Sequence, residues 1–528
     1  MDNRLQPNRV ANVAIWSLLN GLVSAGITTV VLRHVEFDNL ALSWVSKAGE
    51  ALLDFIDFPF VEELDWQNTT IGMFAGIYLV MLLLQMCFIL AMKKPSLDFQ
   101  HVTGIHLLTG KQVKTHARRY LKKTKHKALL FLHPFVPMTN KMLTGNIFVF
   151  GMQGSGKSTI IKSLLIQLSS TPYRLFVFDL KHEYEGYTDP ECNLILKIGE
   201  KDGACWDICS DIADESDAAS VSIALIEDDD ESNRFFTEAA REVTKGVLIA
   251  LLKQNKSWSW DDLANRIFAT REQLHTMLVK VYPPAAVLIE DDNKTTQSIR
   301  SVISTRLSWL YSIAEYANNA DTAFSVKQWL QNDDTQLRQV VFQPNAREVM
   351  MSRAVCNAIT ALISSNLLSM PDQDKTQTWL VLDELGNLPK SPALEQWLTL
   401  SRSKGGRTIA GTQSLSQLNS VYGEKASSTL LSLFRTNIVL GLGAAGGSAQ
   451  QASEAMGNHR VLTIQRSKSE VGNVSLTEQF DDRPVISAED ITNVAEPDKY
   501  GVTGYAVIGG CKAIYKLKWP YPSAKAIR

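Results

Sequence analysis

The chain has 528 residues, of which 45% are hydrophobic and 20% are charged, and its formal net charge is −2. This length exceeds what one compact core usually holds, so we expect two or three domains, and the ordinary glycine and proline content excludes a disordered or fibrous chain. Because the net charge is close to zero, any surface for a polyanion must come from local segregation of charge. The six cysteines form no C-x-x-C pair and have no histidine at zinc-ligand spacing, so we expect reduced thiols and no zinc site.

Two apolar segments near the N-terminus, residues 10–32 and 71–92, contain no Asp, Glu, Lys or Arg. At 1.5 Å per residue of helix, each is long enough to cross the hydrocarbon core of a bilayer. Buried core helices, or a signal peptide for the first segment, are the alternatives. The first segment carries no A-x-A cleavage signal, which favours a retained span. We therefore predict a two-helix transmembrane anchor over residues 1–95.

The charges around these segments predict their orientation. Arg4 and Arg9 precede the first segment and Lys93 and Lys94 follow the second, whereas the loop 33–70 is mostly acidic. Basic flanks stay on the cytoplasmic side, so the loop is expected in the periplasm and both termini in the cytoplasm. The predicted location is the bacterial inner membrane, with the large remaining part of the chain facing the cytoplasm.

Residues 96–140 form a predicted juxtamembrane linker with a dense basic stretch. Contact with anionic lipid headgroups and contact with nucleic acid explain this stretch equally well, and both can hold at once. The basic residues are Lys111, Lys114, Arg118, Arg119, Lys122, Lys123, Lys125 and Lys127.

The strongest motif is a phosphate-binding loop. The apolar run 146–150 predicts a strand, and hydrophobic residues at helical spacing after residue 159 predict a helix. Between them, residues 151–159 read GMQGSGKST and match G-x-x-x-x-G-K-[ST]. The glycines let backbone N–H groups wrap nucleotide phosphates, and the helix N-terminus adds a favourable dipole. The predicted nucleotide-binding residues are Gly151, Gly154, Ser155, Gly156, Lys157, Ser158 and Thr159.

A pair of acidic residues completes the predicted site. Lys157 is expected to reach the β- and γ-phosphates of ATP, and the Ser158 hydroxyl to bind Mg²⁺. The apolar strand 379–382 ends at Asp383 and Glu384, and such a strand end lies beside the phosphate loop in parallel α/β sheets. We predict that Asp383 binds Mg²⁺ through water and that Glu384 orients and deprotonates the attacking water. The adjacent pair indicates hydrolysis rather than a nucleotide switch.

Further apolar runs separated by helical stretches define the fold class. We predict an α/β fold, a RecA-like P-loop NTPase sheet built from residues 141–213 and 331–528. The interval 214–330 lacks strong strands and shows helical periodicity, so we predict an inserted all-α domain there. The remaining strand-like runs are residues 175–178, 340–342, 408–410, 437–441 and 504–508.

Several residues after the acidic pair are candidates for a role in turnover. Gln413 follows a predicted strand, a position suited to sensing the γ-phosphate. Arg402 and Arg407 are candidates for an arginine finger donated to a neighbouring subunit, because a planar cation at the transferred phosphoryl group accelerates hydrolysis. Arg435 is a third candidate. A surface or DNA-contacting role for these arginines is an open alternative.

The order of these motifs resembles that of type IV secretion coupling proteins, particularly the conjugative TraD and TrwB group within the FtsK- and HerA-like motor superfamily. The resemblance is carried by the two-span anchor and by residues 151–159, 178–184 (FDLKHEY), 383–385 (DEL), 411–418, 421–425 and 484–491.

This resemblance implies a homo-hexameric ATPase around a central channel, which pumps relaxase-bound single-stranded DNA to a type IV secretion channel during conjugation. It implies cargo recognition by the all-α domain and contacts with the relaxosome and with channel components. It also implies that Arg402 matches the family's trans-acting arginine better than Arg407. The alternatives are an FtsK-like translocase on double-stranded DNA, a pump for protein effectors, and an assembly scaffold. A membrane protease is disfavoured because the chain has no H-E-x-x-H.

Overall fold

The computed structural model describes residues 100–124, 127–200, 203–227, 233–254, 257–331, 336–373, 378–388, 390–468 and 474–523. The predicted membrane anchor lies outside these residues, so its two spans stay predictions. Among the helices of the described part, none is both long and apolar enough to cross a membrane.

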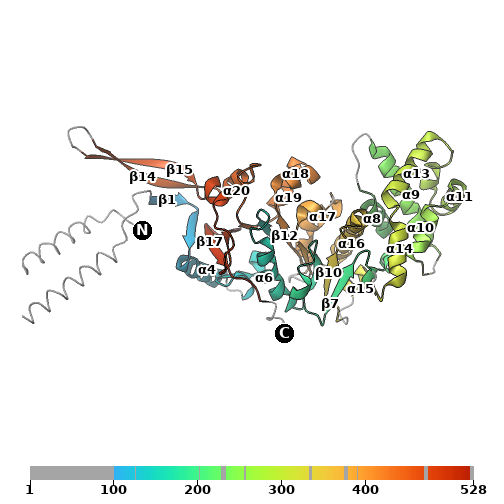
Figure 1. The fold of residues 1–528 in the computed structure, drawn as a ribbon, viewed down its shortest axis with the longest axis horizontal. Coiled ribbons are helices and arrows are strands. Elements are labelled where there is room, and N and C mark those ends of the chain that lie inside the picture. The colour runs from blue at the N-terminus through green and yellow to red at the C-terminus, as the bar shows by residue number, and fades with distance from the viewer. Residues whose placement is uncertain are drawn as a thin grey trace, which may run out of the picture. The chain divides into compact units, whose positions relative to one another are not determined.

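A ten-stranded mixed sheet forms the centre of the described chain (Figure 1). All neighbours from β13 to β7 are parallel, β16 is antiparallel to β13 and β17, and β2 is parallel to β17. In sheet order the strands are β2 (His106–Thr109), β17 (Ala513–Trp519), β16 (Val502–Ile508), β13 (Thr436–Val439), β5 (Ile147–Phe150), β12 (Gly406–Thr412), β11 (Thr378–Leu382), β6 (Arg174–Phe178), β10 (Gln339–Gln343) and β7 (Asn193–Lys197).

This architecture confirms the predicted α/β class. Every apolar run predicted as a strand lies in the sheet, whereas β2, β7 and β17 were not predicted. The two antiparallel pairings of β16 make the sheet mixed at one end, while the strands around the phosphate loop are parallel as expected.

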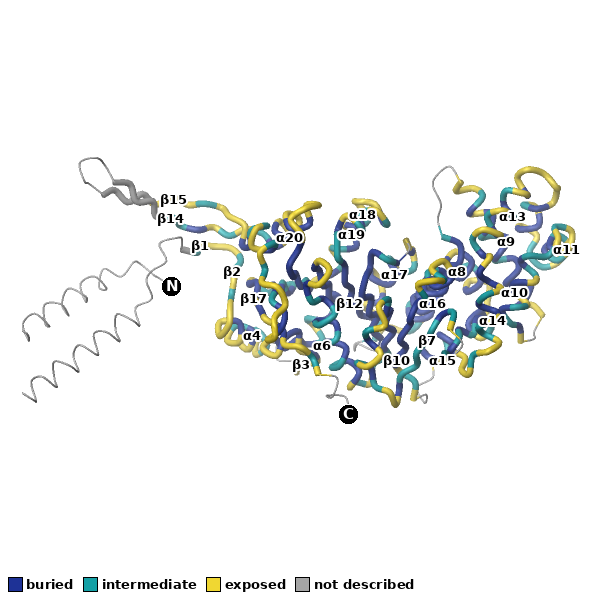
Figure 2. The backbone as a smooth tube through the Cα atoms, viewed as in Figure 1, coloured by how far each residue is buried: buried dark blue, intermediate teal, exposed yellow. Residues whose placement is uncertain are grey.

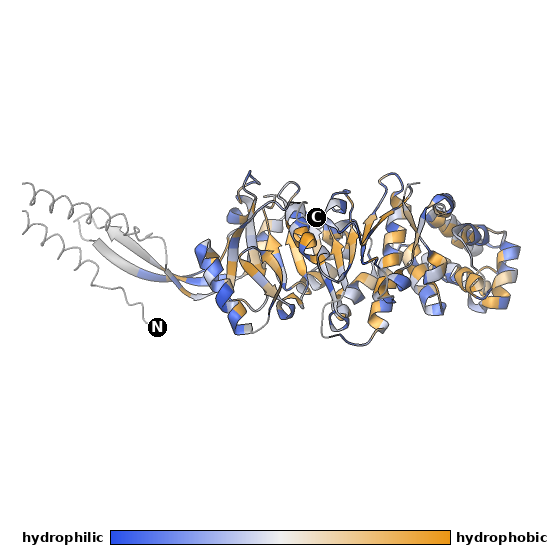
Figure 3. Ribbon diagram, turned by 90° about the horizontal axis from the view of Figure 1, so that it is seen from below, coloured by the Kyte–Doolittle hydropathy of each residue, from blue (hydrophilic) through white to orange (hydrophobic). Residues whose placement is uncertain are grey.

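Both faces of the sheet are buried. Side chains alternate along a strand, so Ile147 and Val149 of β5 face one side and Phe148 and Phe150 the other, and all four are buried. Helix α6 (Lys157–Ser169) and the hairpin of β3 (Ala128–His133) and β4 (Val136–Thr139) cover the first face. Helices that follow β10 and β11 cover the second. Burial on both sides explains why these strands read as continuous apolar runs (Figures 2 and 3).

The helices on the second face come mostly from the last third of the chain. Buried residues of α16, α17, α18 and α20 join the core formed by Phe148 and Phe150. The bounds are α16 (Val349–Ser369), α17 (Pro392–Leu400), α18 (Leu415–Tyr422), α19 (Glu424–Ser432), α20 (Ser448–Met456) and α21 (Ala488–Thr492).

The interval predicted as all-α is helical between two short strands. Strands β8 (Ala204–Trp206) and β9 (Thr322–Phe324) pair in parallel and frame it, and they were not predicted. Buried tryptophans Trp258, Trp260 and Trp309 belong to its core. The helices are α7 (Ile208–Asp211), α8 (Glu215–Leu225), α9 (Arg234–Leu252), α10 (Trp260–Ile267), α11 (Arg271–Val281), α12 (Pro283–Val287), α13 (Lys294–Leu307), α14 (Leu310–Asn319) and, after β9, α15 (Val326–Gln331).

One buried carboxylate, that of Asp211, makes hydrogen bonds to residues next to both short strands that frame this helical segment. Asp211 accepts hydrogen bonds from Trp206 Nε1 at 2.7 Å and Ser325 Oγ at 2.6 Å, and from the backbone N–H groups of Val326 and Lys327 at 2.8 and 2.9 Å. Burial raises the pKa of Asp211, and these donors oppose that effect. Asp211 therefore links the point where the chain enters the helical segment to the point where the chain leaves it.

The predicted linker, residues 96–140, contains regular structure. Strand β2 extends the central sheet, and β1 (Gln100–Gly104) pairs with β14 (Asn458–Lys468), which pairs with β15 (Val474–Pro484). Helix α4 (Lys111–Thr124) buries Val113 and Ala117, and α5 (Asn140–Leu143) leads to β5. The exposed side chains of α4 include the basic residues Lys111, Lys114, Arg118, Arg119, Lys122 and Lys123.

Candidate active site

The phosphate loop joins β5 to α6, as predicted, and two of its glycines have positive φ. Gly154 and Gly156 have φ of 78° and 96°, in the left-handed region that favours glycine. A Cβ on Gly156 would lie 2.4 Å from Val502 Cγ2, and one on Gly151 would lie 2.3 Å from Ser155 Oγ. The loop is therefore a tight turn whose backbone shape requires glycine, which fits a phosphate cradle at a helix N-terminus.

Neighbouring strands hold this loop in place. Met152 N donates to Gly441 O at 2.9 Å, and Gly151 N donates to Thr412 O at 3.3 Å. Within the loop, Ser155 Oγ donates to Met152 O at 2.7 Å. The loop is thus attached to the chain directly after β13 and to the last residue of β12.

Lys157 is directed into the loop. Its Nζ donates to Gly151 O at 2.8 Å, and the side chain is buried. Burial lowers the pKa of Lys157, while the nearby carboxylates Glu384 and Asp383 raise it. A cation that is partly compensated by two acids and aimed across the loop is suited to bind the negative charge of phosphates.

Asp383 lies at the carboxyl end of β11, which is separated from β5 and its phosphate loop by the single strand β12. The Tyr184 hydroxyl donates to its Oδ1 at 2.6 Å. Burial raises the pKa of Asp383, and the Tyr184 hydrogen bond and the cations Lys181 and Lys157 oppose this. The backbone of β12 passes very close to that of Asp383, since a Cβ on Gly411 would lie 2.4 Å from Asp383 O.

Glu384 is 1% exposed and only one of its oxygens has partners. Oε1 accepts from Thr412 Oγ1 at 2.9 Å and from Gln413 N at 3.1 Å. Oε2 is buried without a hydrogen-bond partner in the described part of the chain. An unpartnered buried carboxylate oxygen is costly, so its retention beside a phosphate loop fits a group that accepts a proton from water.

The oxygen donors expected for Mg²⁺ lie together. Burial raises the pKa of Tyr184, and a hydrogen bond with the Ser158 hydroxyl opposes this rise, so Ser158 lies beside the tyrosine that contacts Asp383. A hydroxyl, a carboxylate and water suit a hard cation such as Mg²⁺. Of the predicted site residues, the structure brings together at this edge of the sheet Gly151, Gly154, Ser155, Gly156, Lys157, Ser158, Thr159, Asp383, Glu384 and Gln413.

The candidate arginines lie at the amino ends of β12 and β13, which we call the amino edge of the sheet; the nucleotide site lies at the opposite, carboxyl edge. Arg402 is exposed in the 3-10 turn η4 (Ser401–Lys404), before β12 begins, whereas Glu384 contacts the end of β12. Seven strand residues separate the two edges by about 20 Å at about 3.3 Å per residue. Arg435 is exposed directly before β13, at the same edge as Arg402. Neither residue reaches the phosphate loop of its own chain.

Arg407 has a different environment from the other two arginines. It is 3% exposed, and its Nη1 donates to Arg402 O at 3.1 Å and to Gly406 O at 2.6 Å. Burial lowers the pKa of Arg407 to about 10. The side chain is built into the start of β12.

Residue-based reasoning missed Tyr184, Asp179 and Thr412. Asp179 was recognised only as the end of strand 175–178, and Tyr184 only as part of the family resemblance, although β6 pairs directly with β11. A polar residue at the carboxyl end of an adjacent strand was the available signal.

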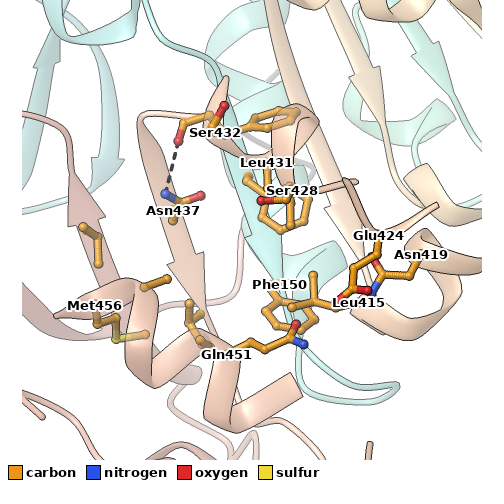
Figure 4. Close-up of a pocket in the computed structure, with 16 residues that line it drawn as sticks. Phe150, Leu415, Asn419, Glu424, Ser428, Leu431, Ser432, Asn437, Gln451 and Met456 are labelled. Atoms are coloured by element: carbon orange, nitrogen blue, oxygen red, sulfur yellow. Dashed lines mark hydrogen bonds between the residues drawn. The ribbon is translucent and has the colours of Figure 1, made fainter. Parts of the chain in front are cut away.

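A separate cavity of about 520 Å³ lies on the other face of β5 from α6 (Figure 4). Phe148, Phe150 and Phe434 contribute to its apolar lining, with Asn419 and Glu424 among its polar residues. The phosphate loop does not line it, so this cavity is distinct from the candidate active site.

Known proteins resemble this chain over most of its described length. A family model described as the type IV secretion-system coupling protein DNA-binding domain matches residues 131–511. The coupling protein TraD of Escherichia coli strain K12 is 25% identical over 296 residues, which are 55% of this chain and 41% of TraD. The match therefore spans well under half of that relative.

Solved structures show the same fold. The unbound bacterial conjugative coupling protein TrwBdeltaN70 has a TM-score of 0.69 at 22% identity, covering 80% of this chain and 95% of that one. The plasmid coupling protein TrwB in complex with ADP and Mg²⁺ has a TM-score of 0.66 at 22% identity, covering 80% and 96%.

The family model covers more than half of the chain, and the relatives agree with it. The resemblance expected from the order of motifs is confirmed, and the protein belongs to the family of type IV secretion-system coupling proteins.

Proposed function

We propose that this protein is an ATP-hydrolysing coupling protein that pumps relaxase-bound single-stranded DNA to a type IV secretion channel during bacterial conjugation. The observation that carries the proposal is Glu384, buried beside the phosphate loop with Oε1 fixed by two donors and Oε2 without a partner. Family membership supports the DNA substrate, since the matching family model is described as a DNA-binding domain. The structure of TrwB with ADP and Mg²⁺ supports the nucleotide and the metal.

The residues of the site divide the chemistry between them. Loop N–H groups and Lys157 bind the phosphates, and Ser158 and Asp383 would hold Mg²⁺, which neutralises phosphate charge when bound. Thr412 and Gln413 N fix one oxygen of Glu384, so Oε2 is oriented to take a proton from the attacking water. Gln413 directly follows β12, and its backbone N–H donates to Glu384, which supports a role for its side chain in sensing the γ-phosphate.

The assembly and its location form the second part of the proposal. Residues 1–95 anchor the protein in the inner membrane, the helical interval 214–330 recognises cargo, and six copies surround a channel. The exposed Arg402 is the proposed trans-acting arginine, because Arg407 is buried in its own chain. Arg402 and Glu384 lie at opposite ends of β12, which is about 20 Å long, so a finger at Arg402 would serve the site of a neighbour and the active site would be complete only between subunits.

The test is ATP turnover by the full-length protein in detergent, with and without single-stranded and duplex DNA. We expect single-stranded DNA to stimulate turnover and Lys157→Ala to abolish it. Lys141→Ala, at an exposed lysine on α5, is the matched control and should behave as wild type.

Other outcomes would redirect the proposal. Stimulation by duplex DNA alone would favour a double-stranded DNA translocase. ATP turnover that does not change when DNA is added would favour an effector pump or a scaffold. Turnover that persists in Lys157→Ala would contradict the assigned nucleotide site.

A further inference from the structure

Tyr184 connects the turn after β6 to the carboxylate at the end of β11. Its side chain is wholly buried, and its hydroxyl donates to Asp383 Oδ1 at 2.6 Å, across 199 residues of sequence. A hydrogen bond to a charged acceptor of this length is among the stronger ones in proteins. The bond commits Oδ1 to the protein, which leaves Oδ2 to serve the metal site.

Asp179 holds the backbone that carries this tyrosine. Its Oδ1 accepts from Glu183 N at 2.8 Å, and its Oδ2 accepts from Tyr184 N at 2.9 Å. Gln343 Nε2, at the end of β10, lies 3.3 Å from the same Oδ2. Asp179 is wholly buried, so these bonds are shielded from water.

The turn is fixed at a further point. His182 has φ of 57°, an unfavourable conformation for a residue with a side chain, and its Nε2 lies 3.1 Å from Pro344 O. The turn is thus bound to the chain that leaves β10 as well as to Asp179. Residues on three neighbouring strands of the sheet, β10, β6 and β11, therefore determine where the Tyr184 hydroxyl lies.

We propose that Tyr184 is a positioning residue for the Mg²⁺-nucleotide, acting through its hydrogen bond to Asp383. This inference rests on the proposed function, because it assigns a role within the same ATP site. Without the hydroxyl, the Asp383 carboxylate can rotate about its last side-chain torsion, so the metal ligand loses its fixed orientation. Residues that orient a metal ligand through a hydrogen bond typically change metal affinity by about 10- to 100-fold when they are replaced.

The chain offers a matched control in the same turn. Tyr187 lies three residues on, in the 3-10 turn η1 (Glu185–Tyr187), and Lys162 Nζ lies 5.2 Å from its ring centre and 5.8 Å from that of Tyr184. Unlike Tyr184, Tyr187 makes no hydrogen bond through its hydroxyl to any residue that the structure describes. Tyr184→Phe and Tyr187→Phe each remove one oxygen and keep the aromatic ring, so they separate the hydroxyl's effect from core packing.

The experiment measures binding of N-methylanthraniloyl-ADP to the full-length protein, in Mg²⁺ and in EDTA. For wild type and Tyr187→Phe we expect Mg²⁺ to strengthen binding. For Tyr184→Phe we expect this strengthening to fall at least about tenfold, with affinity in EDTA unchanged. The double variant Tyr184→Phe/Asp383→Asn should lose no more of the Mg²⁺ effect than Asp383→Asn alone, because the hydroxyl acts on the metal only through the Asp383 carboxylate.

Two results would overturn the inference. One is a Mg²⁺ effect in Tyr184→Phe equal to that of wild type. The other is an equal loss of affinity in Mg²⁺ and EDTA, which would assign Tyr184 to general stability. In either case a wild type that binds and hydrolyses ATP keeps the proposed function intact, whereas a wild type that binds no nucleotide refutes the function itself.

Discussion

The two edges of the central sheet carry different chemistry. At the carboxyl edge, Lys157, Asp383 and Glu384 are buried and connected to neighbouring strands by hydrogen bonds. At the amino edge, Arg402 and Arg435 are exposed. The difference teaches that the residues that bind and orient nucleotide are built into one end of the strands, while the exposed arginines lie at the other end, where our proposal assigns Arg402 to the site of a neighbouring copy.

Arg402→Ala tests this comparison most strongly. We expect turnover by the assembled protein to fall by about 10³-fold or more, the range of arginine fingers, with nucleotide binding retained. Mixing these subunits with Lys157→Ala subunits should restore turnover, because each then supplies what the other lacks. Phosphate release across mixing ratios measures this.

The Arg402 prediction has its own control. Arg435→Ala changes a second exposed arginine of the same edge and should lower turnover far less. An equal loss in both variants, or no restoration on mixing, would mean that the amino edge contributes in some other way.

Glu384→Gln should have the next largest effect. The amide cannot take the proton from water, so kcat should fall by about 10²- to 10⁴-fold while KM for ATP changes little. Rapid-quench measurement of ATP cleavage separates this from product release. Unchanged cleavage would remove Glu384 from the chemistry and leave the carboxyl edge with a binding role only.

Thr412→Val should lower kcat by about tenfold. It removes the hydroxyl that donates to Glu384 Oε1 and leaves the Gln413 N donor in place. Thr408→Val is the matched control on the same strand, since Thr408 Oγ1 accepts from Trp397 Nε1 and does not touch Glu384. If both variants lose activity equally, β12 packing rather than Glu384 orientation is responsible.

Arg407→Leu should have the smallest effect on turnover, within about a factor of three. Folding lowers the pKa of Arg407 to about 10, so its charge opposes folding at neutral pH, and an apolar replacement removes that cost together with the bonds to two carbonyl groups. Parallel measurements of kcat and thermal unfolding check this. A loss as large as that of Arg402→Ala would identify Arg407 as part of the finger.

Local sequence was sufficient to predict the nucleotide-site residues at the carboxyl ends of the strands. The phosphate loop was predictable because its glycines, its lysine and its flanking strand and helix are contiguous, and Asp383 and Glu384 because they end an apolar strand. Parallel strands bring such ends together, so two separated motifs predicted one site.

Contacts that depend on the pairing of strands far apart in the sequence could not be predicted from the sequence. Tyr184 meets Asp383 only because β6 and β11 become neighbours, and nothing within residues 178–184 shows which carboxylate its hydroxyl will find. Strand β2 was missed because it has only four residues and joins the sheet through β17, near the other end of the chain. Arg407 could not be identified as buried, since charge favours the surface and its backbone lies in an interior strand.

The hydrogen bonds of Asp211 bring the two ends of the helical segment together. Its chain departs and returns at one short parallel pair that a single carboxylate clamps, and the supports of the phosphate loop, Thr412 and Gly441, lie elsewhere in the sequence. A homologous segment grafted after α8 would exchange the outer helices, whereas α8 must stay, because Asn357 of α16 donates to Ala224 O and Arg353 pairs with Glu227.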